Sequence, residues 1–229
     1  MTEYAHDIYS QNGEDGIIEE IINRIGTVPK YFVEFGGWDG FHCSNAANLR
    51  ENKGWVGVMF ELDGNKAVEG LVYDQAITSE NVNEIFETYN VPGVFGLLSI
   101  DIDGDDYYVW KKLDKKYNPA IVVIEYNYHL DNSEPMIYIE QGLNQTRSNV
   151  YHNYFNSNLL AMCELGISKG YVVAAVVNCN IIFVRKDLQK RAGIESLTAS
   201  DVVKKYESRE LKEEREYKTE KIKYMGWVK

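Results

Sequence analysis

The sequence lacks any long apolar run. No stretch approaches the roughly 20 apolar residues that a helix needs to cross a bilayer. The first residues, Met1 to Tyr4, also lack the basic and apolar regions of a signal peptide. We therefore expect a cytoplasmic protein without a membrane partner.

Cysteine and positive charge are both scarce. The three cysteines, Cys43, Cys163 and Cys179, are odd in number and show no metal-site spacing, which suits a reducing compartment. With 24 basic against 35 acidic residues, the net charge is -11. This charge argues against a broad surface for nucleic acid or anionic membranes, although it leaves a local basic groove open.

Two chemical signatures are also missing. No glycine-rich loop is followed by Lys and Ser or Thr, which argues against an NTPase that cradles phosphates. The four histidines have no metal-ligand spacing. Among them only His129 is a catalytic candidate, because it comes just after a predicted strand.

The most informative stretch spans residues 31–40, YFVEFGGWDG. Its first half favours a buried strand, and its glycines favour a tight turn that brings the backbone close to a ligand. Residues 44–52 then read as a helix with Ser44 as N-cap. A strand, a glycine turn and a helix open a nucleotide-binding α/β fold. Glu61 ends the next predicted strand about 20 residues on, where such folds place an acid on ribose hydroxyls.

The remaining pattern predicts a parallel sheet. Strands are expected at 31–35, 55–61, 71–77, 94–102 and 120–125, separated by helices, and two more at 171–177 and 181–184 form a hairpin. Alternation of strands and helices implies right-handed crossovers. Isoleucines at helical spacing over 17–25 predict a helix before the first strand, and the polar residues 10–16 either cap it or fold over the ligand mouth.

We therefore predict a doubly wound, mostly parallel, seven-stranded α/β sheet with a C-terminal antiparallel hairpin. This is the Rossmann-like arrangement of class I methyltransferases, whereas a dinucleotide-binding dehydrogenase would continue with a parallel strand. Residues 1–197 form one domain in this interpretation, and residues 198–229 form a charged helix and tail, which is either a solvated face or a homodimer contact. The polar stretch 127–150 predicts a functional loop.

Several sequence blocks resemble a subgroup of the FkbM-type methyltransferase family. They are residues 9–16 (YSQNGEDG), 33–40 (VEFGGWDG), 98–104 (LSIDIDG), 106–110 (DYYVW), 123–127 (VIEYN) and 183–185 (FVR). The resemblance implies an S-adenosylmethionine-dependent O-methyltransferase, often one that acts on sugars. The sequence departs from the family at Trp38 in the glycine turn and at Phe155-Asn156-Ser157, where relatives tend to have Gly-Ala-Ser.

The strand-end rule for open sheets collects the predicted cofactor site at one edge. Predicted cofactor-binding residues are Glu34, Gly36, Gly37, Asp39, Gly40, Ser44, Glu61 and Asp101. Glu34 and Asp39 would meet the methionine end, Glu61 the ribose, and Gln75, Ala76 or Ile77 the adenine. The alternative for Glu34 and Glu61 is that they bond the free amides of the next helix.

A second constellation follows two neighbouring strands. Alternate residues on a strand face the same way, so Asp101 with Asp103, and Glu125 with Asn127, could present oxygens to one point. Such ligands would hold Mg²⁺ or Mn²⁺. Without metal, Asp101 or Glu125 would act as general base, with His129 as a further catalytic candidate. The alternative is that residues 103–106 form a turn and a helix cap.

The leading hypothesis is methyl transfer from S-adenosylmethionine to a hydroxyl of a small molecule or glycan. The Asp101-Ile102-Asp103 pattern also fits a metal-dependent nucleotide-sugar transferase. A third hypothesis is a non-catalytic binding module, motivated by Trp38.

Overall fold

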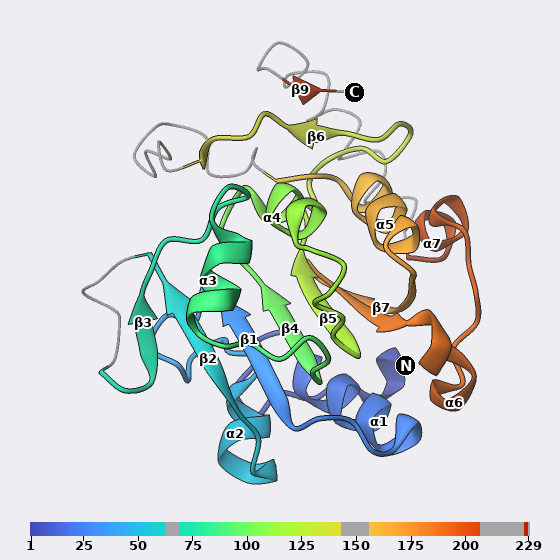
Figure 1. Ribbon diagram of the computed structural model, residues 1–229. Coiled ribbons are helices and arrows are strands. Elements are labelled where there is room, and N and C mark those ends of the chain that lie inside the picture. The colour runs from blue at the N-terminus through green and yellow to red at the C-terminus, as the bar shows by residue number, and fades with distance from the viewer. Residues whose placement is uncertain (63–68, 143–155, 207–226, 229) are drawn as a thin grey trace.

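The computed structural model describes residues 1–62, 69–142, 156–206 and 227–228. Seven strands form one sheet in the order β3-β2-β1-β4-β5-β8-β7 (Figure 1). Their bounds are β1 Tyr31–Phe35, β2 Val56–Glu61, β3 Val72–Asp74, β4 Leu97–Ile100, β5 Ile121–Glu125, β7 Tyr171–Val177 and β8 Asn180–Arg185. The predicted α/β fold class with seven strands is confirmed.

Strand directions match the expected doubly wound arrangement. The first five strands, β1 to β5, pair in parallel with one another. β8 is antiparallel to both β5 and β7. The strand order reverses beside β1, between β1 and β4, and an open sheet binds its ligands at the carboxyl edge next to such a switch. The switch therefore identifies the edge at which the predicted site should lie.

Helices cover both faces of the sheet. They are α1 Glu14–Ile25, α2 Ala47–Lys53, α3 Val82–Thr88, α4 Asp106–Lys112, α5 Leu159–Ser168, α6 Gln189–Ala192 and α7 Ala199–Tyr206. One apolar core joins α3, α4, α5 and α7 to the sheet, and a second core joins α1, α2 and α6 to the opposite face. This two-sided cover explains why every residue of β4 is buried, as its continuous apolar run predicts.

Several elements differ in extent from the sequence prediction, and β4, for example, is shorter than the expected 94–102. The helix expected from Ser44 begins at Ala47, but the Ser44 hydroxyl still accepts hydrogen bonds from the amides of Ala46 (3.2 Å) and Ala47 (3.0 Å). β3 has only three residues, shorter than the expected 71–77. Most of the predicted charged helix and tail at 198–229 lies outside the described residues, so the homodimer prediction stays untested.

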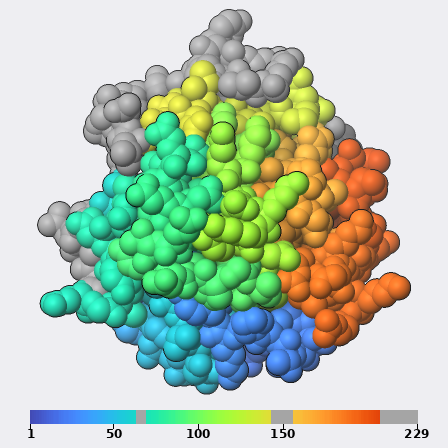
Figure 2. Space-filling model, viewed as in Figure 1, coloured from blue at the N-terminus to red at the C-terminus, as the bar shows by residue number. Residues whose placement is uncertain are grey.

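Part of the long polar segment crosses the carboxyl edge. β6 Ile137–Tyr138 pairs antiparallel with β9 Trp227–Val228, near the C-terminus (Figure 1). In the space-filling view the yellow segment that contains β6 forms surface above the teal and green elements α3 and α4 (Figure 2). None of the helices that the structure describes has both the length and the apolar character for crossing a membrane.

Candidate active site

The glycine turn after β1 brings two strand ends together. Gly36 has φ +74°, and a Cβ at this position would lie 1.6 Å from the carbonyl oxygen of Asp101. Only glycine allows this approach, because any side chain would collide with the backbone. The amide of Gly37 donates to Phe60 O (2.9 Å) and that of Gly40 to Gly37 O (2.7 Å). These two amides are therefore used within the protein.

A pocket opens beside this turn at the carboxyl edge. It is lined by Gly36, Phe60, Glu61, Leu62, Gln75, Ala76, Ile77, Thr78, Ile102 and Gly142. Of the predicted cofactor residues, Gly36 and Glu61 meet here with all three adenine candidates, Gln75, Ala76 and Ile77. Their individual roles stay predictions.

Glu61 is fixed at the pocket wall by backbone amides. It is buried at the end of β2, where Oε2 accepts from Trp38 N (3.1 Å) and Oε1 from Leu62 N (2.9 Å). The two amides therefore orient the Glu61 carboxylate at the pocket wall.

The Trp38 side chain does not line the pocket. Its backbone has φ 44°, its side chain is 44% exposed, and its ring centroid lies 5.9 Å from that of His42. The indole is therefore not part of the described pocket wall.

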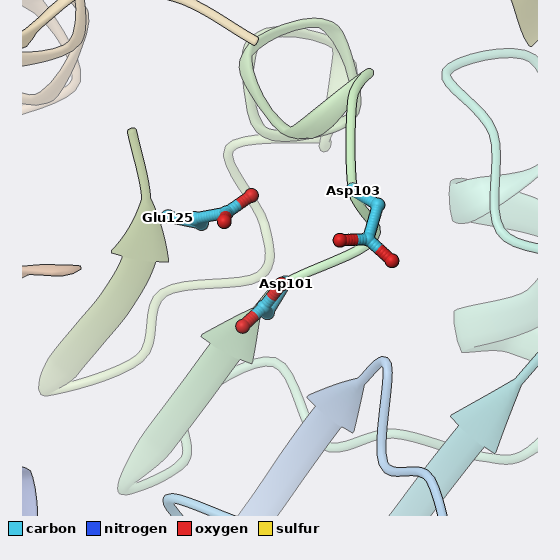
Figure 3. A group of neighbouring side chains, drawn as sticks. All are labelled: Asp101, Asp103 and Glu125. Carbon is cyan, nitrogen blue, oxygen red and sulfur yellow. The ribbon is translucent and has the colours of Figure 1, made fainter. Parts of the chain in front are cut away.

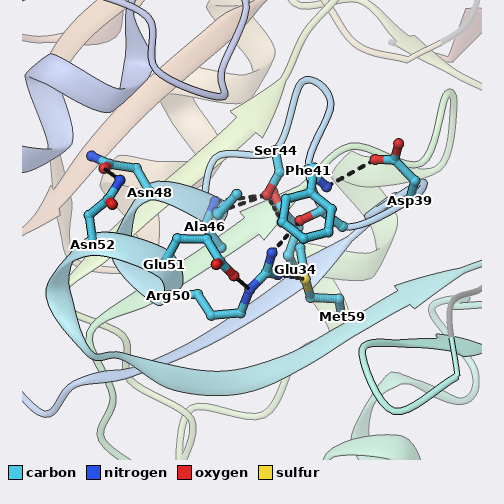
Figure 4. A network of polar contacts seen from close by, with 12 residues as sticks. Glu34, Asp39, Phe41, Ser44, Ala46, Asn48, Arg50, Glu51, Asn52 and Met59 are labelled. Atoms are coloured by element: carbon cyan, nitrogen blue, oxygen red, sulfur yellow. Dashed lines mark hydrogen bonds and ion pairs between the residues drawn. The ribbon is translucent and has the colours of Figure 1, made fainter.

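Glu34 is held inside the protein (Figure 4). Its Oε2 accepts from Ser44 Oγ (2.6 Å) and its Oε1 from Asn45 N (2.8 Å). Burial raises the pKa of Glu34 to about 7, against the opposing effect of these hydrogen bonds. These contacts fit the alternative that a strand-end acid bonds groups at the next helix. Contact of Glu34 or Ser44 with a cofactor stays a prediction.

Asp39 and Arg50 hold the turn from two sides (Figure 4). Asp39 Oδ1 accepts from the amides of Phe41 and His42, both at 2.9 Å. Partial burial would raise the pKa of Asp39, but hydrogen bonds from His42 and Phe41 outweigh it and lower that pKa to about 2. Arg50 Nη2 donates to Gly40 O (2.7 Å), and its guanidinium lies 4.8 Å from the Phe41 ring centroid. Contacts within the protein therefore fix the shape of the turn.

Three carboxylates converge next to the pocket (Figure 3). Asp101, Asp103 and Glu125 each place one oxygen within 4.8 Å of the others. Asp101 and Asp103 follow β4, and Glu125 ends β5. Burial, reinforced by the neighbouring acids, raises the pKa values of Asp101 and Glu125 well above the usual range. The cluster is therefore able to take up a proton or a cation.

Asp106 shapes the loop that carries this cluster. The side chain is fully buried, with Oδ1 accepting from Ile102 N (2.9 Å) and Oδ2 from Gly104 N (3.0 Å). Burial raises the pKa of Asp106 to about 7. Between these amides Asp103 adopts φ 58°, in the left-handed region. The predicted turn at 103–106 therefore coexists with the acid cluster, whereas the N-cap residue of α4, Asp105, makes no side-chain capping bond.

Asn156 is a site residue that sequence reasoning missed. Its Nδ2 lies 3.0 Å from Asp106 Oδ2, 3.1 Å from Glu125 O and 3.3 Å from Glu125 Oε2. The backbone has φ 68°, a conformation that asparagine tolerates better than most residues. The departure from the family pattern at this position was the available signal.

Asn127 and His129 lie beyond the end of β5. Asn127 Oδ1 accepts from the backbone amide of His129 (3.0 Å), and the His129 ring packs 3.9 Å from that of Tyr128 between centroids. The structure thus groups three of the four predicted metal ligands by their carboxylates. A metal role for Asn127 and a catalytic role for His129 stay predictions.

Residues 10–16 reach the same edge from the other face. The buried Glu14 accepts from Asn180 Nδ2 (2.8 Å) through Oε1 and from Asn12 N (2.8 Å) through Oε2. Asn12 Oδ1 in turn accepts from Asn178 Nδ2 (2.9 Å). The segment therefore both begins α1 and ties it to the β7–β8 hairpin beside Glu125.

Comparison with known proteins gives fold-level likeness. Neither a protein-family model nor a curated protein matches the sequence, so the FkbM resemblance stays a prediction. One similar solved structure is of an O-methyltransferase family protein from Burkholderia thailandensis, with a TM-score of 0.44 and 10% identity. The match covers 74% of this chain and 55% of that one, so the chain spans about half of that protein's length. A likeness this weak supports no conclusion about activity.

Proposed function

We propose that this protein is an S-adenosylmethionine-dependent O-methyltransferase that acts on a hydroxyl of a small molecule or glycan. One observation is central to this proposal. Ile102 lines the pocket, while the residues on either side of it, Asp101 and Asp103, belong to the acid cluster. A ligand in the pocket would therefore present its reactive end to a group held by the carboxylates.

The residues around the pocket fit the nucleoside part of this cofactor. Glu61 offers acceptors for ribose hydroxyls, and Phe60 with Ile77 offers apolar contact for a base. The bound cofactor would supply an electrophilic methyl group on a sulfonium. The glycine turn would border its amino-acid end, as the predicted roles of Glu34 and Asp39 require.

The acid cluster would activate the acceptor. Asp101 or Glu125 would accept the proton that the acceptor hydroxyl loses on methylation, with the thioether of the spent cofactor as leaving group. The raised pKa values of these two groups suit them to receive it. Holding acceptor and methyl in line would supply much of the rate.

A divalent cation fits the same three carboxylates. Hard oxygen ligands from two strand ends match the preference of Mg²⁺ or Mn²⁺. Bound there, the cation would lower the pKa of an acceptor hydroxyl and relieve repulsion among the acids. A metal dependence of the reaction is therefore part of the test.

The test is calorimetric titration with S-adenosylhomocysteine, with and without Mg²⁺. We expect micromolar binding that weakens at least tenfold in Glu61→Gln, because an amide replaces one acceptor oxygen. Glu84→Gln, an exposed acid on α3, is the matched control and should bind like wild type.

Two outcomes would redirect the proposal. Absence of binding in both conditions would refute it. Tight Mn²⁺-dependent binding of a nucleoside diphosphate would instead favour a nucleotide-sugar transferase, because the pattern of Asp101 and Asp103 also fits that class of enzyme.

A further inference from the structure

We propose that Asp105 is a positioning residue that holds residues 141–142 as one wall of the cofactor pocket. This inference rests on the proposed function, since it concerns the nucleoside end of that site. Gly142 belongs to the pocket lining although it lies far along the chain from the other lining residues. Contacts with other parts of the protein must therefore keep residues 141–142 against the pocket.

Asp105 makes the contacts that do so. Its Oδ2 accepts from Gly142 N (2.7 Å) and from Gln141 N (3.1 Å), and its Oδ1 accepts from Gln141 N (3.0 Å). The residue is only 3% exposed. Hydrogen bonds from amides to a buried carboxylate are charge-assisted and stronger than neutral ones. Two successive amides on one carboxylate fix the direction of the chain at Gly142.

The position of Asp105 makes this use notable. It is the N-cap residue of α4, where an aspartate ordinarily accepts a hydrogen bond from an amide of its own helix. Asp105 makes no such capping bond. Its acceptor oxygens instead serve a segment 36 and 37 residues later in the chain. The side chain therefore acts between elements rather than within α4.

Two further contacts attach the residues just before this pair, Tyr138 and Glu140, to α4 and to the turn before α3. Tyr108 Oη, on α4, donates to Tyr138 O (2.9 Å). Ser79 Oγ donates to Glu140 Oε1, and Ser79 follows the pocket residue Thr78. The segment thus bridges α4 and the turn before α3, consistent with the course of β6 above these helices in Figure 1.

The consequence is specific to one half of the ligand. Gly142 shares the pocket lining with Glu61 and residues 75–78, where the nucleoside would lie. The glycine turn at the other end is held separately by Asp39 and Arg50. Loss of the Asp105 contacts should therefore weaken adenosine and the whole cofactor by the same factor.

The experiment compares Asp105→Asn with wild type by titration of adenosine and of S-adenosylhomocysteine. An asparagine retains one acceptor oxygen but turns an amide group toward a backbone amide, so we expect about tenfold weaker binding of both ligands. Hydrogen exchange at the amides of residues 141 and 142 should accelerate in this variant. Asp114→Asn removes an exposed aspartate that accepts from Lys116 N (2.9 Å) and is the matched control.

The outcomes separate this inference from the proposed function. If wild type binds both ligands and Asp105→Asn binds them equally well, or loses S-adenosylhomocysteine while keeping adenosine, the positioning role is refuted and the proposed function stands. If wild type binds neither ligand, both the positioning role and the proposed function are refuted. Should Asp105→Asn fail to fold, Asp105→Glu, which keeps the charge but displaces the carboxylate, provides the same test, and wild-type affinity in that variant would refute the inference.

Discussion

Two groups of acids lie at the same edge of the sheet and are used in opposite ways. Glu34, Asp105 and Asp106 each accept hydrogen bonds from at least two groups of the chain. Asp101, Asp103 and Glu125 instead face one another. Glu34, Asp105 and Asp106 are buried, whereas Asp101 and Glu125 are half-buried and Asp103 is exposed. The neighbours differ as well: amides and hydroxyls surround the first group, whereas carboxylates dominate around the second.

This difference separates acids that hold the site from acids that are available for chemistry. A carboxylate surrounded by donors stabilises its loop, and its removal leaves those donors unsatisfied. A carboxylate surrounded by other carboxylates is destabilised by repulsion between like charges. A proton, a cation or a substrate hydroxyl that binds there relieves this repulsion. Clusters of mutually repelling acids of this kind are typical of functional sites.

The largest effect should come from truncating one acid of each group. Asp106→Ala removes the acceptor for Ile102 N, Gly104 N and Asn156 Nδ2 in a buried place, and we expect a loss of about 3 kcal/mol in the free energy of unfolding. Asp101→Ala relieves repulsion in the cluster and should leave the stability at pH 8 unchanged or raised by about 1 kcal/mol. Urea unfolding of both variants measures the contrast. Equal destabilisation would erase the distinction between the two groups.

The free energy of unfolding should depend on pH because Glu34 is a buried acid. Its pKa is about 7 in the folded protein and near 4.3 in an unfolded chain, so its charge is unfavourable in the fold. This penalty is absent below pH 4, grows as the pH rises through the interval between the two values and is complete above 7. Glu34→Gln cannot ionise, so wild type should lose about 2–3 kcal/mol relative to the variant between pH 5 and 8. A stability difference independent of pH, in urea titrations at both values, would contradict this account.

A smaller effect should follow at the residue that joins the two groups. Asn156→Ala removes a donor shared by Asp106 and Glu125, so the pKa of Glu125 should rise further and stability should fall by about 1–2 kcal/mol. Carboxyl NMR titration and thermal unfolding measure the two changes. Asn52→Ala, an exposed asparagine on α2, is the control. An unchanged Glu125 titration would show that Asn156 does not influence the cluster.

The fold was largely predictable because its signals are local. The apolar run that forms β4 and the turn-prone Asn178-Cys179 between β7 and β8 each indicate their structure without reference to the rest of the chain. The meeting of Glu61 with residues 75–77 followed from the rule that parallel strands end at one edge. These predictions needed only periodicity and topology.

The assignment of individual acids was less predictable because it depends on distant partners. At the end of a strand, Glu34 suits a ligand and a helix amide equally well, and only the fold places Ser44 and Asn45 against it. Asp105 reads as a helix cap, yet its partners lie 36 and 37 residues away. Asn156 acts through a left-handed backbone and a contact with an acid 50 residues earlier. No local pattern encodes these pairings.

The most direct measurement is a crystal structure with S-adenosylhomocysteine and Mn²⁺, using anomalous scattering to locate the metal. The account predicts the nucleoside between Glu61, residues 75–78 and Gly142, and the methionine end at the glycine turn. Any Mn²⁺ should lie among Asp101, Asp103 and Glu125, next to the sulfur. A ligand bound elsewhere, or a cluster too far from the sulfur for a hydroxyl to bridge the two, would contradict the proposal that the pocket and the acids form one active site.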